Sequence, residues 1–572
     1  MIKPLYAPIA LATALVAAAS SPALADTLIH NANGVQVDAA GKLERFVGLI
    51  IGDDGKVVQL IRADDEKQPA RISRRIDAGG KTLLPGLIDA HGHVVDSPGN
   101  GMGLGLASLQ LDLNGVDSIA ELQRRLGAFA AANPDAPWIQ GRGWNQELFR
   151  ERRMPTAQDL DQAVAGRPVW LERVDGHAAV GNAAAMKLAG IGAQTRDPVG
   201  GRIERDKGGV ATGLFVDNAT ALMSTSLPAI TAATMDRALV SAQNLLLANG
   251  ITTVADMGTS VRGWETMKRL GSDGRLAIRI ISYADGLAPL KAVAGSASTA
   301  WLFGDRLRMG GVKLYTDGAL GSRGAWLKAP YTDKPDTRGL RFLTDAELID
   351  QARQAAGQGY QLAIHAIGDA ANQQVIAAYE QLAKKYPGDR RWRLEHAQVL
   401  DIADLPRLSK TGIIASMQPT HQTSDRTMAE ARLGPDRLAG AYAWQTIAKS
   451  GVRLAFGSDF PVESPNPFPG LAAAVSRQGL DGQPEGGWRP QERVSFEAAL
   501  AGFTRGAAYA GFADDKIGSL DPGKYADFIL VDRDVSTVSP GELGRTEVLE
   551  TWVAGKKVWQ RAASAGAGER GR

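Results

Sequence analysis

Eight short apolar runs with the character of β-strands recur along the chain, and helical patterns separate several of them. The runs cover residues 83–94, 251–258, 277–285, 308–318, 360–369, 391–398, 412–420 and 452–460. Strands that alternate with helices favour a parallel sheet, and eight βα units are the number that closes a TIM barrel. We therefore predict an α/β fold whose main domain is a (β/α)8 barrel over residues 85–510.

The stretch between the first two runs is far too long for a single βα unit. This stretch, about residues 97–245, contains strand-like runs of its own, WIQGRGW and PVWLERV, and several helical patterns. We interpret it as a long insertion after the first barrel strand, packed over the mouth of the barrel.

The two ends of the chain are rich in β-like runs. Residues 26–84 alternate such runs with Gly and Asp turns, including the hairpin signal Asp54-Gly55, and residues 511–561 have the same character. We predict that both ends together form one small β-sandwich domain. Residues 562–572 are rich in Gly, Ala and Arg, and we expect them to form a disordered tail.

The first 25 residues have the pattern of a signal peptide. Lys3 supplies a basic segment, ALATALVAAA an apolar one, and Ala23-Leu24-Ala25 a cleavage site before Asp26. An uncleaved membrane anchor is the alternative, but the apolar run is short for a span. We expect a periplasmic or secreted protein without stable membrane insertion after cleavage. With no cysteine in the chain, a metal would rest on His, carboxylate or lysine ligands.

Polar residues gather at the ends of the strand-like runs. Five of the seven histidines lie there, and an aspartate ends the last run: His91, His93, His365, His396, His421 and Asp459. A strand directs residues i and i+2 to the same face, so His91 and His93 can reach one point in space. A single histidine beside an apolar run is usually a core residue, but the whole set predicts a metal site at the barrel mouth.

Lys313 lies inside an apolar run, GGVKLYTDG, where a charged ammonium is costly to bury. One interpretation is a lysine with a buried stem whose head reaches a carboxylate at the barrel mouth. The other is that burial lowers its pKa and the neutral amine reacts with carbon dioxide. The resulting carbamate offers two oxygens and could bridge two metal ions.

Six motifs in order resemble the amidohydrolase superfamily, and more narrowly its YtcJ-like family 3 branch, which includes N-substituted formamide deformylases. They are LLPGLIDAHGHV, GVKLYTDGALGSRGAW, LAIHAIGDAAN, RLEHAQ, MQPTHQTSD and FGSDFPVESPNPF. Each motif alone is weak, but the ordered set is specific and the resemblance runs from about residue 27 to 560. It implies a metal-bearing (β/α)8 barrel with a small β-sandwich from the two chain ends.

The same resemblance implies a role for each strand-end residue. His91 and His93 would bind one metal ion, His365 and His396 a second, and carboxylated Lys313 would bridge the two. Asp459 would contact the first metal ion and act as the catalytic acid and base. We expect one or two divalent ions, zinc first, although Mn, Fe, Co and Ni accept the same ligand types.

Three further residues are candidates for binding substrate. His177, in RVDGHAAVGN, matches a segment typical of this branch and is otherwise a histidine that stabilises a loop. His421 follows the seventh run and would contact substrate or support a ligand. Arg323, in GSRGAW, would hold a substrate carboxylate or carbonyl, or else form a structural ion pair.

The predicted activity is metal-dependent hydrolysis of a non-peptide carbon–nitrogen bond, of the N-substituted amide or formamide type, by metal-activated hydroxide. The same site hydrolysing a dipeptide, lactone or other ester is the alternative, and an exported binding or regulatory protein with an inactive site is a third. The 64 basic and 62 acidic residues form no block that suggests nucleic acid. We expect a small-molecule substrate, and a homo-oligomer stays open.

Overall fold

The computed structural model describes residues 26–63, 72–97, 101–146, 148–173, 178–198, 201–224, 226–295 and 297–562. The predicted signal peptide and all of the predicted tail beyond residue 562 lie outside these ranges. Within the described residues, no helix combines the length and apolar character needed to cross a lipid bilayer.

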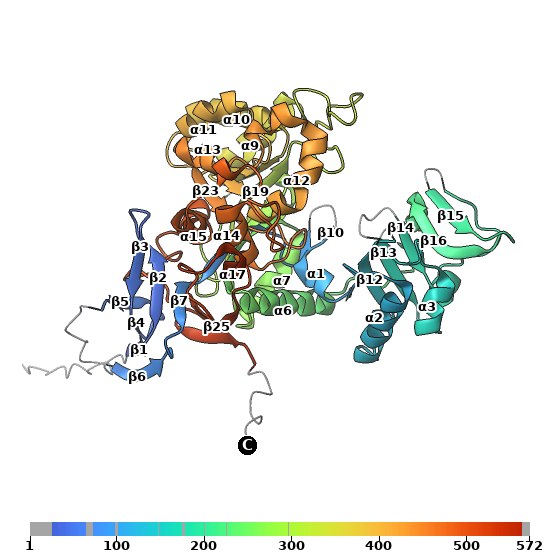
Figure 1. The fold of residues 1–572 in the computed structure, drawn as a ribbon, viewed down its shortest axis with the longest axis horizontal. Coiled ribbons are helices and arrows are strands. Elements are labelled where there is room, and N and C mark those ends of the chain that lie inside the picture. The colour runs from blue at the N-terminus through green and yellow to red at the C-terminus, as the bar shows by residue number, and fades with distance from the viewer. Residues whose placement is uncertain are drawn as a thin grey trace, which may run out of the picture.

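An eight-stranded parallel sheet forms the centre of the molecule (Figure 1). Each strand pairs in parallel with its sequence neighbour. The strands are β8 (Leu87–Gly92), β17 (Ile251–Thr259), β18 (Arg279–Asp285), β19 (Leu307–Tyr315), β20 (Gln361–Ala366), β21 (Arg393–His396), β22 (Ile414–Met417) and β23 (Arg453–Phe456). The predicted TIM barrel is therefore confirmed, and each of the eight runs overlaps one barrel strand.

Backbone hydrogen bonds just beyond the strands close the barrel between its first and eighth members. The amide of Asp459 donates to the carbonyl of His91 at 2.7 Å, and the amide of His93 donates to the carbonyl of Phe460 at 2.9 Å. The two segments approach closely, because a Cβ at Gly457 would lie only 2.5 Å from the His91 amide nitrogen. This closure places Asp459 beside the histidine pair.

Helices surround the barrel strands and bury one large apolar core against them. Several of them begin with side-chain caps, as at α9, where Thr344 and Glu347 form the reciprocal capping box. These helices are α6 (Ala232–Ala248), α7 (Val261–Ser272), α8 (Leu287–Ala294), α9 (Asp345–Gly357), α10 (Asp369–Lys385), α11 (Leu405–Thr411), α12 (Pro419–Leu433), α13 (Trp444–Lys449), α14 (Pro467–Ser476), α15 (Phe496–Gly502) and α16 (Arg505–Ala510).

Two sheets built from the chain ends pack on each other at one side of the barrel. The first has the order β5 (Val57–Ile61), β4 (Gly48–Ile51), β1 (Asp26–His30) and β6 (Ile72–Asp77). The second has the order β26 (Lys556–Gln560), β25 (Val548–Val553), β24 (Phe528–Val531), β7 (Thr82–Pro85), β2 (Asn33–Val37) and β3 (Leu43–Phe46). Ile29 and Leu49 of the first share a core with Phe528 and Trp552 of the second, which confirms the predicted sandwich.

The insertion has a sheet and a core of its own. Its strands, in sheet order, are β11 (Leu111–Asp112), β12 (Ile139–Trp144), β13 (Val169–Arg173), β14 (Ala178–Gly181), β16 (Ala211–Asp217) and β15 (Gly201–Arg205). Its main helices are α2 (Ile119–Ala132), α3 (Ala157–Ala163) and α4 (Ala183–Leu188).

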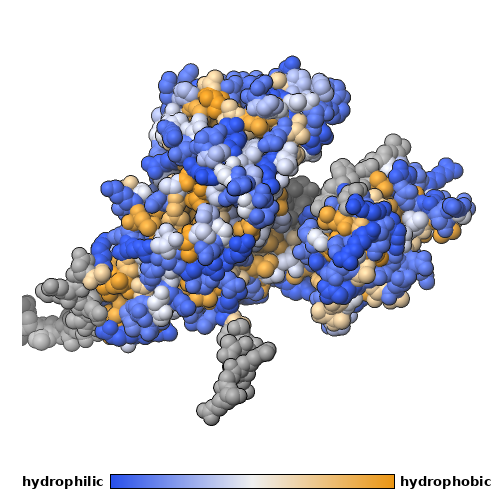
Figure 2. Space-filling model, viewed as in Figure 1, coloured by the Kyte–Doolittle hydropathy of each residue, from blue (hydrophilic) through white to orange (hydrophobic). Residues whose placement is uncertain are grey.

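The insertion stands beside the barrel in Figure 1. The segment that leads into it contains β9 (Asp96–Ser97), β10 (Gly101–Met102) and α1 (Leu104–Ser108), and α5 (Ala221–Ser224) follows its last strand. The space-filling view shows a mostly hydrophilic surface and a hollow between the insertion and the barrel (Figure 2). Packing of the insertion over the mouth of the barrel, which we expected from the sequence, stays a prediction.

Candidate metal centre

His91 and His93 lie at the carboxyl end of β8, where the extended backbone directs both side chains toward Asp459. His93 Nε2 lies 3.1 Å from Asp459 Oδ1, and His91 Nε2 lies 3.5 Å from the same oxygen. His91 is fully buried, and the other two are almost so. The predicted convergence of the His-x-His pair on one point is therefore present in the structure.

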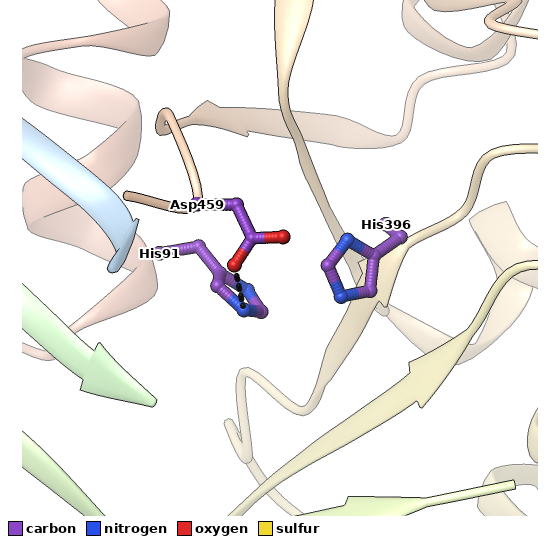
Figure 3. A group of neighbouring side chains, drawn as sticks. All are labelled: His91, His396 and Asp459. Carbon is purple, nitrogen blue, oxygen red and sulfur yellow. Dashed lines mark ion pairs between the residues drawn. The ribbon is translucent and has the colours of Figure 1, made fainter. Parts of the chain in front are cut away.

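His396 joins this group from the end of β21. The ligand atoms of His91, His396 and Asp459 lie within 4.8 Å of one another, and Figure 3 shows the three side chains turned toward a common space. The backbone φ is 72° at His396 and 61° at Asp459, a left-handed conformation that is uncommon outside glycine. Strained backbone of this kind persists only where the surroundings hold it, and it concentrates at functional sites.

His365, on β20, lies on the other side of His396. The centroids of the two imidazole rings are 4.5 Å apart. His365 Nε2 lies 3.4 Å from Asp317 Oδ1, and the Asp317 carboxylate also accepts hydrogen bonds from the amides of Ile367 and Gly368. The backbone that follows β20 therefore fixes the carboxylate that faces the His365 ring.

Lys313, on β19, completes the set. Its Nζ lies 3.1 Å from His91 Nε2, and the side chain is buried. Burial lowers the pKa of Lys313 to about 8, although the nearby carboxylates of Glu395 and Asp459 oppose that change. The neutral amine, which is the form that reacts with carbon dioxide, is therefore a minor fraction at pH 7, but a much larger one than for an exposed lysine.

Polar partners behind the imidazoles fix their orientation. Glu395 Oε2 accepts a hydrogen bond from His91 Nδ1 at 2.7 Å, and Arg393 Nε donates to Glu395 Oε1 at 2.6 Å. His396 Nδ1 lies 2.9 Å from Gln418 Oε1. With Nδ1 engaged in each case, the Nε2 lone pairs of His91 and His396 are left for the shared space.

The buried Glu395 carboxyl is held ionised. Burial raises its pKa, but the charge of Arg393 and the hydrogen bond from His91 outweigh burial and hold that pKa below its usual range. Sequence reasoning missed both Glu395 and Gln418. A signal existed for Glu395, since RWRLEHAQ places a charged pair, Arg393 and Glu395, inside an apolar strand.

All six predicted metal ligands and His421 line one cavity of about 570 Å³. Within the described residues, His93 Nδ1, His365 Nε2 and His421 Nε2 are buried and without a hydrogen-bond partner. Buried polar atoms are normally satisfied, so orphaned imidazole nitrogens at one place are the expected signature of a ligand site. Four imidazoles with a carboxylate and a lysine fit a divalent cation.

A protein-family model described as the amidohydrolase family matches residues 74–559. The chain belongs to the amidohydrolase family. Membership confirms the resemblance inferred from the motifs. It also supports the prediction that the protein is a hydrolase.

Individual relatives are similar over most of the chain. The chain is 35% identical over 504 residues to Protein LONG AFTER FAR-RED 3 of Arabidopsis thaliana, covering 85% of this chain and 83% of the relative. It is 28% identical to the N-substituted formamide deformylase of Arthrobacter pascens, over 94% of this chain and 99% of the relative. The crystal structure of an uncharacterized metal-dependent hydrolase from Pyrococcus horikoshii superposes with a TM-score of 0.73 at 27% identity, covering 90% and 99%.

The three predicted substrate residues of this amidohydrolase lie in different surroundings. His421 lines the cavity, and its Nε2 is 3.7 Å from Asp459 Oδ2. Arg323 does not line the cavity, although Gly321 does, and its guanidinium forms an ion pair with Asp333 at 2.8 Å. His177 lies outside the described residues. A direct role in binding substrate stays a prediction for all three.

The cavity also contains a residue that sequence reasoning missed. Arg142, on β12, lines it and comes from the insertion. No local pattern in WIQGRGW distinguishes this arginine from a surface residue, because its place depends on how the insertion meets the barrel.

Proposed function

We propose that the protein is a metal-dependent hydrolase of a non-peptide carbon–nitrogen bond in a small N-substituted amide, such as a formamide. The observation that carries the proposal is the convergence of six potential ligands from five barrel strands in one cavity. Similarity to an N-substituted formamide deformylase over nearly the whole chain supports the choice of bond. The signal-peptide pattern of residues 1–25 supports a periplasmic or secreted location.

His91, His93, His365, His396 and Asp459 would hold one or two divalent ions, zinc being our first choice. Such an ion lowers the pKa of bound water to near neutrality and polarises a carbonyl oxygen. Lys313 would join the ligands as a carbamate formed from its neutral amine and carbon dioxide. A 13C spectrum of the metal-loaded protein in labelled bicarbonate would contain a carbamate signal, and its absence would rule the modification out.

Asp459 would move the proton. Burial opposes its ionisation, but interactions with the imidazoles of His91 and His93 hold the pKa of this carboxyl well below its usual range. The carboxylate is therefore in the basic form. It would accept the proton of the attacking water and pass it to the nitrogen as the carbon–nitrogen bond breaks, giving a carboxylic acid and an amine. His421, whose Nε2 lies 3.7 Å from Asp459 Oδ2, would orient the substrate.

The test is a hydrolysis screen on purified protein combined with metal analysis. N-alkyl and N-arylalkyl formamides, with dipeptide, lactone and ester panels beside them, would be scored by amine or acid release. We expect bound metal and formamide turnover, both lost in His396→Asn. His30→Asn, in the terminal sheet β1, is the matched control and should retain both.

Two outcomes would contradict the proposal. Turnover confined to dipeptides, lactones or other esters would show that the site hydrolyses those bonds instead. Stoichiometric metal without turnover on any panel would favour an inactive binding or regulatory protein.

A further inference from the structure

Arg142 is the cavity-lining residue that the insertion contributes, among the described residues. It lies on β12, which pairs in parallel with β13, and its register partner there is Glu172. The side chain is partly buried. An arginine thus faces the same cavity as the proposed metal ligands but belongs to a different part of the fold.

The Arg142 guanidinium has no hydrogen bond or ion pair within the described part of the chain. Glu172, its register neighbour, is engaged with Trp170, and burial raises the Glu172 pKa while the charge of Arg142 partly opposes that rise. Most arginines of the insertion behave differently: Arg153, for example, pairs with Asp159 at 2.7 Å. Arg142 therefore keeps its donors available toward the cavity.

The remaining cavity wall is of mixed character. Leu320, Ile367 and Met428 provide an apolar stretch. Two carboxylates also line the cavity, but each has a partner: Asp425 accepts from Tyr442 Oη at 2.8 Å, and Glu463 accepts from the Ser424 hydroxyl. Neither carboxylate lies within ion-pair distance of Arg142 in the described structure.

We propose that Arg142 binds a carboxylate on the substrate, so that the preferred substrates are N-substituted amides whose nitrogen substituent has an apolar portion and ends in a carboxylate. This inference rests on the proposed function, because it assumes that the amide group lies at the metal ligands. A guanidinium presents its donors in a planar fork that matches a carboxylate bidentately, and charge-assisted hydrogen bonds are about twice as strong as neutral ones. A partly buried, unpaired arginine is suited to this task.

The experiment compares two substrates that differ only in charge. N-formyl-5-aminopentanoate carries the carboxylate, and N-pentylformamide replaces it with a methyl group. Both would be given to the metal-loaded wild-type protein, to Arg142→Gln and to Arg142→Lys. Arg124→Gln is the matched control, since Arg124 belongs to the same insertion but is exposed and paired with Glu121.

We expect the wild type to prefer the carboxylate substrate. Arg142→Gln should lower kcat/KM for that substrate by about 10- to 100-fold, mainly through a higher KM. The same substitution should change kcat/KM for N-pentylformamide by less than about twofold. Arg142→Lys should restore part of the loss, and Arg124→Gln should match the wild type. Calorimetric binding of N-formyl-5-aminopentanoate should weaken by a similar factor in Arg142→Gln.

Hydrolysis of N-pentylformamide with no preference for the carboxylate substrate would overturn the role of Arg142 and leave the proposed function intact. Equal losses of kcat/KM for both substrates in Arg142→Gln would instead assign Arg142 to a contact that holds the insertion on the barrel. If neither substrate is hydrolysed, the proposed function fails for formamides, and the calorimetric comparison alone decides whether Arg142 binds the carboxylate.

Discussion

His91 Nδ1 and Glu395 Oε2 lie 2.7 Å apart, and both side chains are fully buried. The two residues are 304 positions apart in the chain, so the contact exists only because the barrel closes. The carboxylate holds the proton of His91 on Nδ1 and leaves Nε2 unprotonated. In the proposed function it would act on the metal through His91, as a positioning residue.

Replacing this carboxylate should weaken metal binding. In Glu395→Gln the hydrogen bond to His91 can persist, but the charge that balances Arg393 is lost. Loss of such an outer partner typically costs 10- to 100-fold in metal affinity, and we expect about that change by competition with a chromophoric chelator. Glu265→Gln, at an exposed position on α7, should bind metal as the wild type does. Unchanged metal affinity in Glu395→Gln would show that Glu395 has only a structural role.

Asp459→Asn should separate metal binding from proton transfer. The amide keeps one oxygen toward the histidines but cannot accept a proton, so most of the metal should remain while kcat falls on the order of 100-fold or more. Metal content and turnover would be measured on the same preparation. Near-normal turnover would exclude Asp459 as the acid and base.

Removing the metal should abolish hydrolysis and lower the melting temperature. A ligand that binds only the folded state stabilises it by RT ln(1 + [L]/Kd), about 2.7 kcal/mol at a hundredfold excess over Kd. Dialysis against a chelator, followed by return of zinc, manganese or cobalt one at a time, would measure both effects. Activity that survives complete metal removal would contradict a metal-dependent reaction.

Asp534 should stabilise the terminal sheets in a pH-dependent way. Burial disfavours its charge, but hydrogen bonds from Ser536, Asn33 and Arg45 prevail and lower its pKa to about 2. Because the folded pKa lies below the unfolded value, the stabilisation is present above about pH 4 and is lost as the pH falls toward 2. We expect the free energy of unfolding of Asp534→Asn to be about 1–2 kcal/mol lower than that of the wild type at pH 7. The effect is modest because the carboxylate is partly exposed to solvent.

Thermal unfolding between pH 2 and 7 would measure that difference, which should narrow on the acid side. Asp135→Asn, at an exposed position in the insertion, is the control and should follow the wild type at every pH. A constant gap across the whole range would show that ionisation of Asp534 contributes nothing.

The features predictable from the sequence were those that depend on short segments. The run at 391–398 contains β21, and His396 is the last residue of that strand. This position was predictable because the apolar run that forms the strand is a local pattern. Contacts between distant segments were not predictable. The bond between Glu395 and His91 and the place of Arg142 depend on barrel closure and on how the insertion is oriented, and neither leaves a periodic signal in one sequence.

The strand that precedes the histidine pair is also a strand of the terminal sandwich. β7 pairs with β24, so that Thr82 lies opposite Val531 and Pro85 opposite Phe528, and only Gly86 separates β7 from β8. β24, which holds β7, lies more than four hundred residues after His91 and His93 in the chain. The strand that contains the histidine pair therefore depends on the last part of the chain for support. A truncated chain that ends before β24 should lose this support and be unable to complete the site.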